Sequence, residues 1–172
     1  PQHKTAQSKV PANSSSIYFD GSGDQIYATN NHNDFAFGTG DFTIEAWIYP
    51  NSTQNTTSNG DNDVIEKWEG VTGYPYVCRW IRSASRMHIA IYNGSTSQSV
   101  NINGFTTDAW NHFAAVFDHT NDTLTGYRDG QQINQSALTI TGTIANSHDL
   151  WIARRGTSDN DTKNWWTGRI ST

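Results

Sequence analysis

The clearest alternation of apolar and polar positions lies in residues 37–50, where a glycine-rich turn leads into Asp41–Tyr49 and Pro50 follows. Every second residue of this segment belongs to one of two sets: Phe42, Ile44, Ala46 and Ile48, or Thr43, Glu45, Trp47 and Tyr49. Successive side chains of a β-strand point to opposite faces, so the alternation predicts a strand whose first set faces the core. Its aromatic and β-branched residues favour the same structure.

Shorter segments of the same kind recur along the chain, separated by turn residues. We expect strands at residues 17–20, 25–28, 41–49, 64–68, 74–82, 86–92, 97–102, 111–118, 123–128, 131–134, 150–154 and 165–170. The pair Asn93-Gly94 predicts a type I′ turn leading into the strand that begins at Ser97. This many short strands with turns between them predict an all-β fold, a two-sheet antiparallel β-sandwich.

The chain of 172 residues is long enough for one domain with a sizeable core, and it contains seven residues each of Trp, Tyr and Phe. Residues 1–15 lack any periodicity, so we interpret them as a flexible arm or linker. Residues 16–172 are expected to form the single sandwich domain.

Charge and composition exclude several classes of function. The formal net charge is −5 and the basic residues are scattered, which argues against nucleic-acid binding because that needs a dense basic face. The single cysteine, Cys78, cannot form an intrachain disulfide. The sequence contains no apolar run long enough to predict membrane insertion.

Four segments, in this order, resemble the laminin-G-like domain, a jelly roll related to the concanavalin A-like lectins and glucanases. They are Tyr18–Asp24, Phe37–Pro50, Thr107–Asp118 with the following Thr123–Gly130, and Leu150–Arg155. The resemblance implies a surface recognition module, often with calcium on a rim of loops. The Asn- and Thr-rich loops also resemble the lectin-like domains of virion proteins from marine tailed phages.

The chain departs from the laminin-G pattern at two places. Its closing segment, Gly168–Thr172, lacks the acidic residues that the family usually has there, so we expect the last strand to be truncated and the chain to be a piece of a longer protein. Gly126 and Arg128 stand where the family tends to have apolar residues. We interpret them as a weak point of the core or as a face turned to solvent.

Catalysis has little support in the sequence. Retaining glycoside hydrolysis needs two carboxylates about 5–5.5 Å apart. No predicted strand carries such a pair, and Glu45 beside Trp47 is the nearest candidate. The chain also lacks a nucleophile elbow, a dinucleotide-binding loop and a zinc-binding cluster of His or Cys. We therefore predict that the protein is not an enzyme.

Calcium is the metal that the loops could hold, because it prefers six to eight oxygen ligands. Three acidic loops qualify, with candidate ligands Asp20 and Asp24, Asp61 and Asp63, and Asp159 and Asp161. Asp20 and Asp24 rank first because they flank a flexible glycine turn. The alternative is that Asp and Asn occur here because they suit turns.

Sugar binding needs exposed aromatic rings and planar polar groups. The predicted ligand-binding residues are Trp68, Tyr74, Tyr76, Arg79, Trp80 and Arg82 around one loop and hairpin, together with Arg154 and Arg155. The two adjacent arginines could bind a carboxylated or sulfated sugar in a bidentate manner, or could be a solvated rim. For the aromatic residues, the alternative is that most of them cover the core. Trp165 and Trp166 would point to opposite faces of a strand, which could leave one exposed.

Three functions remain open, because a fold alone does not choose between them. The leading one is a non-catalytic module that binds glycan through rim loops, as part of an extracellular or virion-surface protein. The second is a structural domain of a virion, such as a decoration or fibre protein, which would contact protein through its sandwich face and N-terminal arm as a homo-oligomer or lattice. The third is a divergent hydrolase.

Overall fold

The computed structural model describes residues 15–29, 35–54, 61–67, 75–155 and 164–171, with only the backbone at residue 61. In these ranges the strands are β1 (Ile17–Asp20), β2 (Ile26–Ala28), β3 (Phe42–Pro50), β4 (Asp61–Glu66), β5 (Tyr76–Ile81), β6 (Arg86–Tyr92), β7 (Ser97–Asn103), β8 (Asn111–Asp118), β9 (Thr123–Arg128), β10 (Gln131–Ala137), β11 (Leu150–Ile152) and β12 (Thr167–Ser171). One 3-10 turn, η2 (Arg82–Ala84), joins β5 to β6. The predicted arm, residues 1–15, lies outside the described residues except for Ser15.

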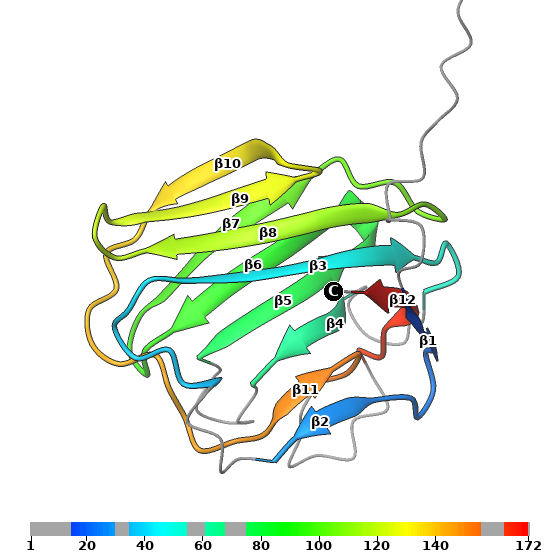
Figure 1. Ribbon diagram of the computed structural model, residues 1–172, viewed down its shortest axis with the longest axis horizontal. Helices are drawn as coiled ribbons and strands as arrows, with labels where there is room; N and C mark the ends of the chain where they lie inside the picture. Colours follow the sequence, from blue (N-terminus) through cyan, green and yellow to red (C-terminus); the bar gives the residue numbers. More distant parts are fainter. Residues whose placement is uncertain (1–14, 30–34, 55–60, 68–74, 156–163, 172) are drawn as a thin grey trace, which may run out of the picture.

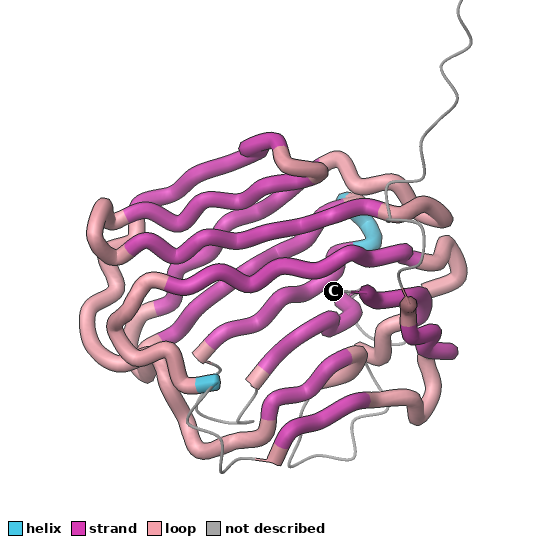
Figure 2. The backbone as a smooth tube through the Cα atoms, in the orientation of Figure 1, coloured by secondary structure: helices cyan, strands magenta, loops and turns pink. Residues whose placement is uncertain are grey.

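The strands form two antiparallel six-stranded sheets that lie one over the other (Figures 1 and 2). Sheet A has the order β1-β12-β3-β8-β9-β10, and sheet B has the order β2-β11-β4-β5-β6-β7. The predicted all-β sandwich is therefore confirmed. The turn through Gly21 and Gly23, both with positive φ, carries the chain from β1 in sheet A to β2 in sheet B.

β3 follows the predicted alternation. Ile44, Ala46 and Ile48 are buried in the core, and Phe42 packs against it. The opposite set, Thr43, Glu45, Trp47 and Tyr49, is partly or fully exposed on the outer face of sheet A. One face of β3 therefore lies at the centre of the core, and the other carries the rings of Trp47 and Tyr49 on the outside of sheet A.

Two predictions about local structure are wrong. The loop between β6 and β7 has four residues, because Tyr92 is paired with Ser97, and only Gly94 in it has positive φ. A type I′ turn needs positive φ at both central residues. Instead, the side chain of Asn93 accepts hydrogen bonds from the backbone N–H groups of Ser95 and Thr96 at 2.9 and 2.8 Å, which closes a wider loop.

The second wrong prediction concerns Gly126, which marks a close approach of the two sheets and is not a weak point of the core. A Cβ atom at this position would lie 2.6 Å from Cγ1 of Ile102 and 3.4 Å from Cγ2 of Val100, both on β7 of the other sheet. Only a glycine lets β9 and β7 pack this closely. Arg128, next on that face, donates from Nη1 to the carbonyl of Asn103 at 2.6 Å and so also joins the two sheets.

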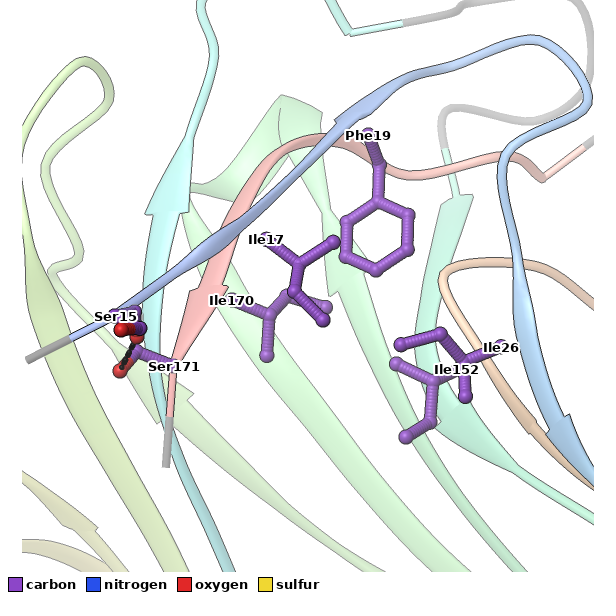
Figure 3. A pocket seen from close by; sticks show the side chains of 7 residues that line it. All are labelled: Ser15, Ile17, Phe19, Ile26, Ile152, Ile170 and Ser171. Atoms are coloured by element: carbon purple, nitrogen blue, oxygen red, sulfur yellow. Dashed lines mark hydrogen bonds between the residues drawn. The ribbon is translucent and has the colours of Figure 1, made fainter.

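The two ends of the sandwich differ. At one end, side chains of β10 bond to the backbone of β7: Ser136 Oγ donates to the carbonyl of Ser99 at 3.0 Å, and Asn134 Nδ2 donates to that of Asn101 at 3.2 Å. At the other end, between β1 and β2, a cavity of about 230 Å³ separates the sheets (Figure 3). Its lining is mainly apolar: Ser15, Ile17, Phe19, Ile26, Ile152, Ile170 and Ser171.

Candidate functional site

The outer face of sheet B carries an exposed aromatic pair at the β2 edge. Ile26 and Ile152 line the cavity between the sheets (Figure 3), so their neighbours Tyr27 and Trp151 point outward by strand alternation. Tyr27 and Trp151 are directly opposite each other in the β2–β11 pair, and their ring centroids are 5.1 Å apart. Tyr27 is 54% exposed, so the pair presents ring surface to solvent. We call these two residues the aromatic platform.

Arg154 extends the platform. Its guanidinium lies 4.9 Å from the ring centroid of Trp151 and 4.7 Å from that of Trp165, within cation–π range of both rings. Nη1 donates to Oε1 of Gln25 at 2.6 Å, and Nε donates to the carbonyl of Arg155 at 2.9 Å. Because these contacts hold the guanidinium plane in place, the cation is pre-oriented before any ligand arrives.

The turn that positions Arg154 is strained. Ala153 has a φ of 72°, in the left-handed region that costs a non-glycine residue of order 1–2 kcal/mol. The turn is anchored on both sides, since the N–H of Ala153 donates to the carbonyl of Val64 at 3.0 Å and its own carbonyl accepts from the N–H of Trp166 at 2.9 Å. Ala153 is itself fully buried. The chain therefore turns sharply after β11, and Arg154 and Trp165 are brought beside Trp151.

A charged network lies next to the platform on the same face. Asp63 is fully buried and accepts from Nε of Arg79 at 2.5 Å and from Nε of Arg155 at 3.2 Å. Glu66, also fully buried, lies 3.9 Å from Nη2 of Arg79 and is opposite Trp151 in the β4–β11 pair. The two carboxylates and two guanidiniums balance in charge, which is the arrangement that a buried ionic cluster requires.

We call the platform, Arg154, Trp165, Gln25 and this network the sheet B site. Of the predicted residues, the structure brings Arg79, Arg154, Arg155 and Asp63 together here. Its rings offer apolar surface on which the C–H face of a sugar can pack, and its guanidiniums offer donors suited to a carboxylate. The combination is therefore suited to a carbohydrate that carries an acidic group.

One prediction about carboxylates is wrong, because β4 does bring two of them to one face. The pairing of β4 with β5 shifts by one residue between Asp63 and Ile65, and this bulge places Asp63 and Glu66 on the same side beside Arg79. Both carboxylates are buried and ion-paired with arginine. General acid catalysis needs a carboxyl group that can reach a substrate, and both of these side chains are fully buried.

The predicted aromatic cluster is also corrected. Tyr76 and Trp80 are 1% and 0% exposed and belong to the core, so neither ring has a face for a sugar. They alternate with Arg79 along β5 and therefore point inward when Arg79 points outward. Burial also raises the pKa of Tyr76. Arg82 is exposed in η2, and the structure shows no contact between it and the sheet B site. Trp68 and Tyr74 lie outside the described residues.

The candidate calcium ligands have different surroundings. Oδ1 of Asp20 accepts from the N–H of Ser22 at 2.7 Å and Oδ2 of Asp24 accepts from the N–H of Asp20 at 3.0 Å, the bonds of a turn. Asp61 and Asp63 lie in strand β4 rather than in a loop, and Asp63 is committed to arginine. Asp159 and Asp161 lie outside the described residues. Over the described ranges, no group of three or more Asp, Glu, His or Cys side chains is arranged to hold a metal ion.

Two carboxylates held by a turn fall short of the six to eight oxygens that calcium takes, so Asp20 and Asp24 alone do not fit the ion. Calcium binding stays a prediction. Within the described part of the chain, no helix is long and apolar enough to span a membrane.

Sequence reasoning did not select Gln25, Tyr27 and Trp151 as ligand residues. The available signal was the outward alternation of Tyr27 and Trp151 in short strands that also hold Ile26 and Ile152. The sequence could not show that β2 pairs with β11, in which Trp151 lies 124 residues after its partner Tyr27.

Two antiparallel six-stranded sheets in this order form a jelly-roll sandwich. The family model described as the concanavalin A-like lectin/glucanases superfamily matches residues 15–172. The chain therefore belongs to this superfamily, and the laminin-G-like resemblance is confirmed. Comparison with curated protein sequences finds no match.

Solved structures with the same fold include the LG4-5 domains of the mouse laminin α1 chain, with a TM-score of 0.64 and 11% identity over 94% of this chain and 42% of that one. The CBM40 domain of the Ruminococcus gnavus IT-sialidase, bound to α2,3-sialyllactose, has a TM-score of 0.62 and 14% identity over 91% of this chain and 87% of that one. The botulinum neurotoxin serotype D binding domain has a TM-score of 0.65 and 13% identity over 91% of this chain and 38% of that one.

At such identities the likeness is one of fold. The chain spans less than half of the laminin and neurotoxin chains and most of the CBM40 chain. These structures are a pair of laminin G domains, a carbohydrate-binding module of a sialidase and the binding domain of a neurotoxin.

Proposed function

We propose that this domain is a non-catalytic glycan-binding module and that the sheet B site binds a sugar carrying a carboxylate. The observation that carries the proposal is Arg154, held between the rings of Trp151 and Trp165 beside the exposed ring of Tyr27. A sugar ring would pack on Tyr27 and Trp151, while its carboxylate would face the guanidinium of Arg154.

The arginines of this face support an acidic ligand. The guanidiniums of Arg79, Arg154 and Arg155 all lie at the sheet B site, and a guanidinium is suited to bidentate recognition of a carboxylate. The guanidinium of Arg154 is pre-oriented by Gln25 and by two rings, which lowers the entropy lost on binding. A related fold, the CBM40 domain, was solved with a sialylated sugar, which agrees with this ligand class.

The test is binding of the purified domain to an array that contains sialylated, uronic-acid and neutral glycans, followed by calorimetry with the best ligand. Arg154→Gln should weaken binding of the acidic glycan about ten- to a hundredfold, since a hydrogen bond to a charged group contributes about 1.5–3 kcal/mol. Arg82→Gln is the matched control, because it removes an exposed arginine elsewhere and should leave binding unchanged.

Equal loss in both variants would mean that general charge, and not the sheet B site, holds the ligand. Absence of binding by the folded domain to any acidic glycan would refute the proposal. Running the array with calcium and again with EDTA tests the predicted calcium dependence.

A second function, assembly in an extracellular or virion-surface protein, has one supporting observation. β1 and β2 are the outer strands of their sheets and expose Ile17 (52%), Tyr18 (49%) and Ile26 (38%). Exposed apolar residues on edge strands favour contact with another chain. Light scattering of the intact chain would test this, since assembly predicts a mass that increases with concentration and falls with Ile17→Lys.

A further inference from the structure

The outer face of sheet A, on the opposite side of the sandwich, carries a second set of aromatic side chains. In the strand register, Tyr18 of β1 lies opposite Arg169 of β12, and Arg169 lies opposite Tyr49 of β3. The guanidinium of Arg169 lies 5.4 Å from the ring centroid of Tyr18, and the rings of Tyr49 and Trp110 meet edge to face at 5.7 Å. These four residues form a row across neighbouring strands, which we call the sheet A row.

A second group lies beside this row on the same face. Trp47 is opposite His112 in the β3–β8 pair, with their ring centroids 5.1 Å apart. Nε2 of His112 lies 3.6 Å from Oε2 of Glu45, beyond the range of a direct hydrogen bond. The Glu45 side chain is 63% exposed and that of His112 is 21% exposed, so both groups keep hydrogen-bonding capacity toward a ligand.

This face differs from an ordinary solvated sheet surface. The inward residues of the same strands, Phe19, Ile48 and Ile170, already fill the core, so the outward rings are not needed to cover it. Binding surfaces are enriched in Trp, Tyr and Arg side chains. This face has partly exposed Trp and Tyr rings together with a carboxylate, an imidazole and a guanidinium.

The dimensions and charge of the face indicate the ligand class. The sheet A row crosses the neighbouring strands β1, β12 and β3 and ends at Trp110, just before β8. At about 4.8 Å from one strand to the next, the row is about 14 Å long, which suits a short chain of sugars better than a single sugar. By strand alternation Asp20 and Asp118 share this face with Glu45 and Arg169, so the face has no surplus of positive charge. Its rings can pack on sugar C–H faces while Glu45 and His112 bond to hydroxyl groups.

We propose that the outer face of sheet A is a second glycan-binding surface, which takes a linear, uncharged oligosaccharide along the sheet A row and Trp47. It uses residues separate from the sheet B site and does not depend on that site's function. Because the two sheets are stacked, the two surfaces face opposite directions (Figure 1). A single domain would then be able to hold an acidic and a neutral glycan at the same time.

The test uses the intact chain and calorimetry with linear β-1,3- and β-1,4-linked glucose hexasaccharides as neutral probes. Trp47→Ala should weaken binding of the preferred probe at least about tenfold, which corresponds to about 1.4 kcal/mol. Trp47 is partly buried, so Glu45→Gln provides a second variant that leaves the packing intact and should weaken binding severalfold. Trp151→Ala, in the sheet B site, is the matched control and should leave neutral binding unchanged.

Three results would overturn the proposal. The first is no binding of either probe at millimolar concentration. The second is neutral binding that Trp151→Ala abolishes and Trp47→Ala leaves intact, which would assign both sugars to the sheet B site. The third is a dimer, detected by light scattering, that Trp47→Ala dissociates, which would make this face a protein interface. Failure of the sheet B proposal would show separately, as absence of acidic-glycan binding.

Discussion

Replacement of Asp63 by asparagine is the sharpest test of the sheet B site as a rigid, ion-paired structure. The two side chains have the same shape, but one carboxylate oxygen becomes an NH₂ group that cannot accept a hydrogen bond. Asp63 uses one oxygen for Arg79 and the other for Arg155. Either orientation of the asparagine amide therefore loses one of these two bonds and leaves the buried cluster with an excess positive charge.

Removing one partner from a buried ion pair typically costs about 3–5 kcal/mol. We expect the lower end, about 3 kcal/mol, because Glu66 remains near Arg79 at 3.9 Å. For a domain of this size, 1 kcal/mol shifts the melting temperature by about 2–4 °C, so the predicted decrease is roughly 6–12 °C.

The assay is urea denaturation followed by tryptophan fluorescence, with thermal unfolding as a second readout. Glu45→Gln is the control, because it removes one partner of an exposed pair with His112 and should cost less than about 1 kcal/mol. An Asp63→Asn variant within about 0.5 kcal/mol of the wild type would refute the reasoning, since surface substitutions typically fall in that range.

Two further predictions follow from local geometry. Gly126→Ala places a Cβ atom 2.6 Å from Cγ1 of Ile102 and should lower the free energy of unfolding, measured by urea denaturation, by about 1–3 kcal/mol. The control Gly40→Ala should be neutral or slightly stabilising, because the nearest atom to its Cβ would be 3.7 Å away and Gly40 has no positive φ. Equal effects of the two substitutions would contradict the close approach of the sheets at Gly126. The side-chain hydrogen bond from Asn121 lowers the pKa of Asp118, so this carboxylate favours folding above about pH 4 and the contribution is lost as the pH falls through the lowered value. Asn121→Ala should raise the pKa of Asp118 toward its ordinary range in an NMR titration, and an unchanged pKa would contradict this assignment.

The fold could be predicted because strand alternation is a local property. In β3 the identities of nine consecutive residues fix which face is buried, and the structure agrees. The bulge in β4 was not visible, because its residues Asp61-Asn-Asp63 have the composition of a loop. They form a strand because Asp63 meets arginines from β5 and from the segment after β11, contacts that local propensity does not contain.

The sheet B site could be predicted only in part, for a related reason. Arg154 and Arg155 stood out as adjacent arginines, and Arg79 as part of the cluster of aromatic residues and arginines around one loop and hairpin. Tyr76 and Trp80 were selected as ligand residues because the sequence gives the period of a strand but not which face meets the core. Tyr27 and Trp151 acquire their role only when β2 and β11 pair.

The central claim is that an acidic glycan binds at the sheet B site, and the indole N–H signals of the tryptophans in an NMR titration test it most directly. On addition of the acidic glycan, we expect the signals of Trp151 and Trp165 to move together and saturate, while those of the core residues Trp80 and Trp166 stay in place. Assignments come from Trp151→Phe and Trp165→Phe. Saturable binding that leaves the Trp151 and Trp165 signals unmoved would contradict the account.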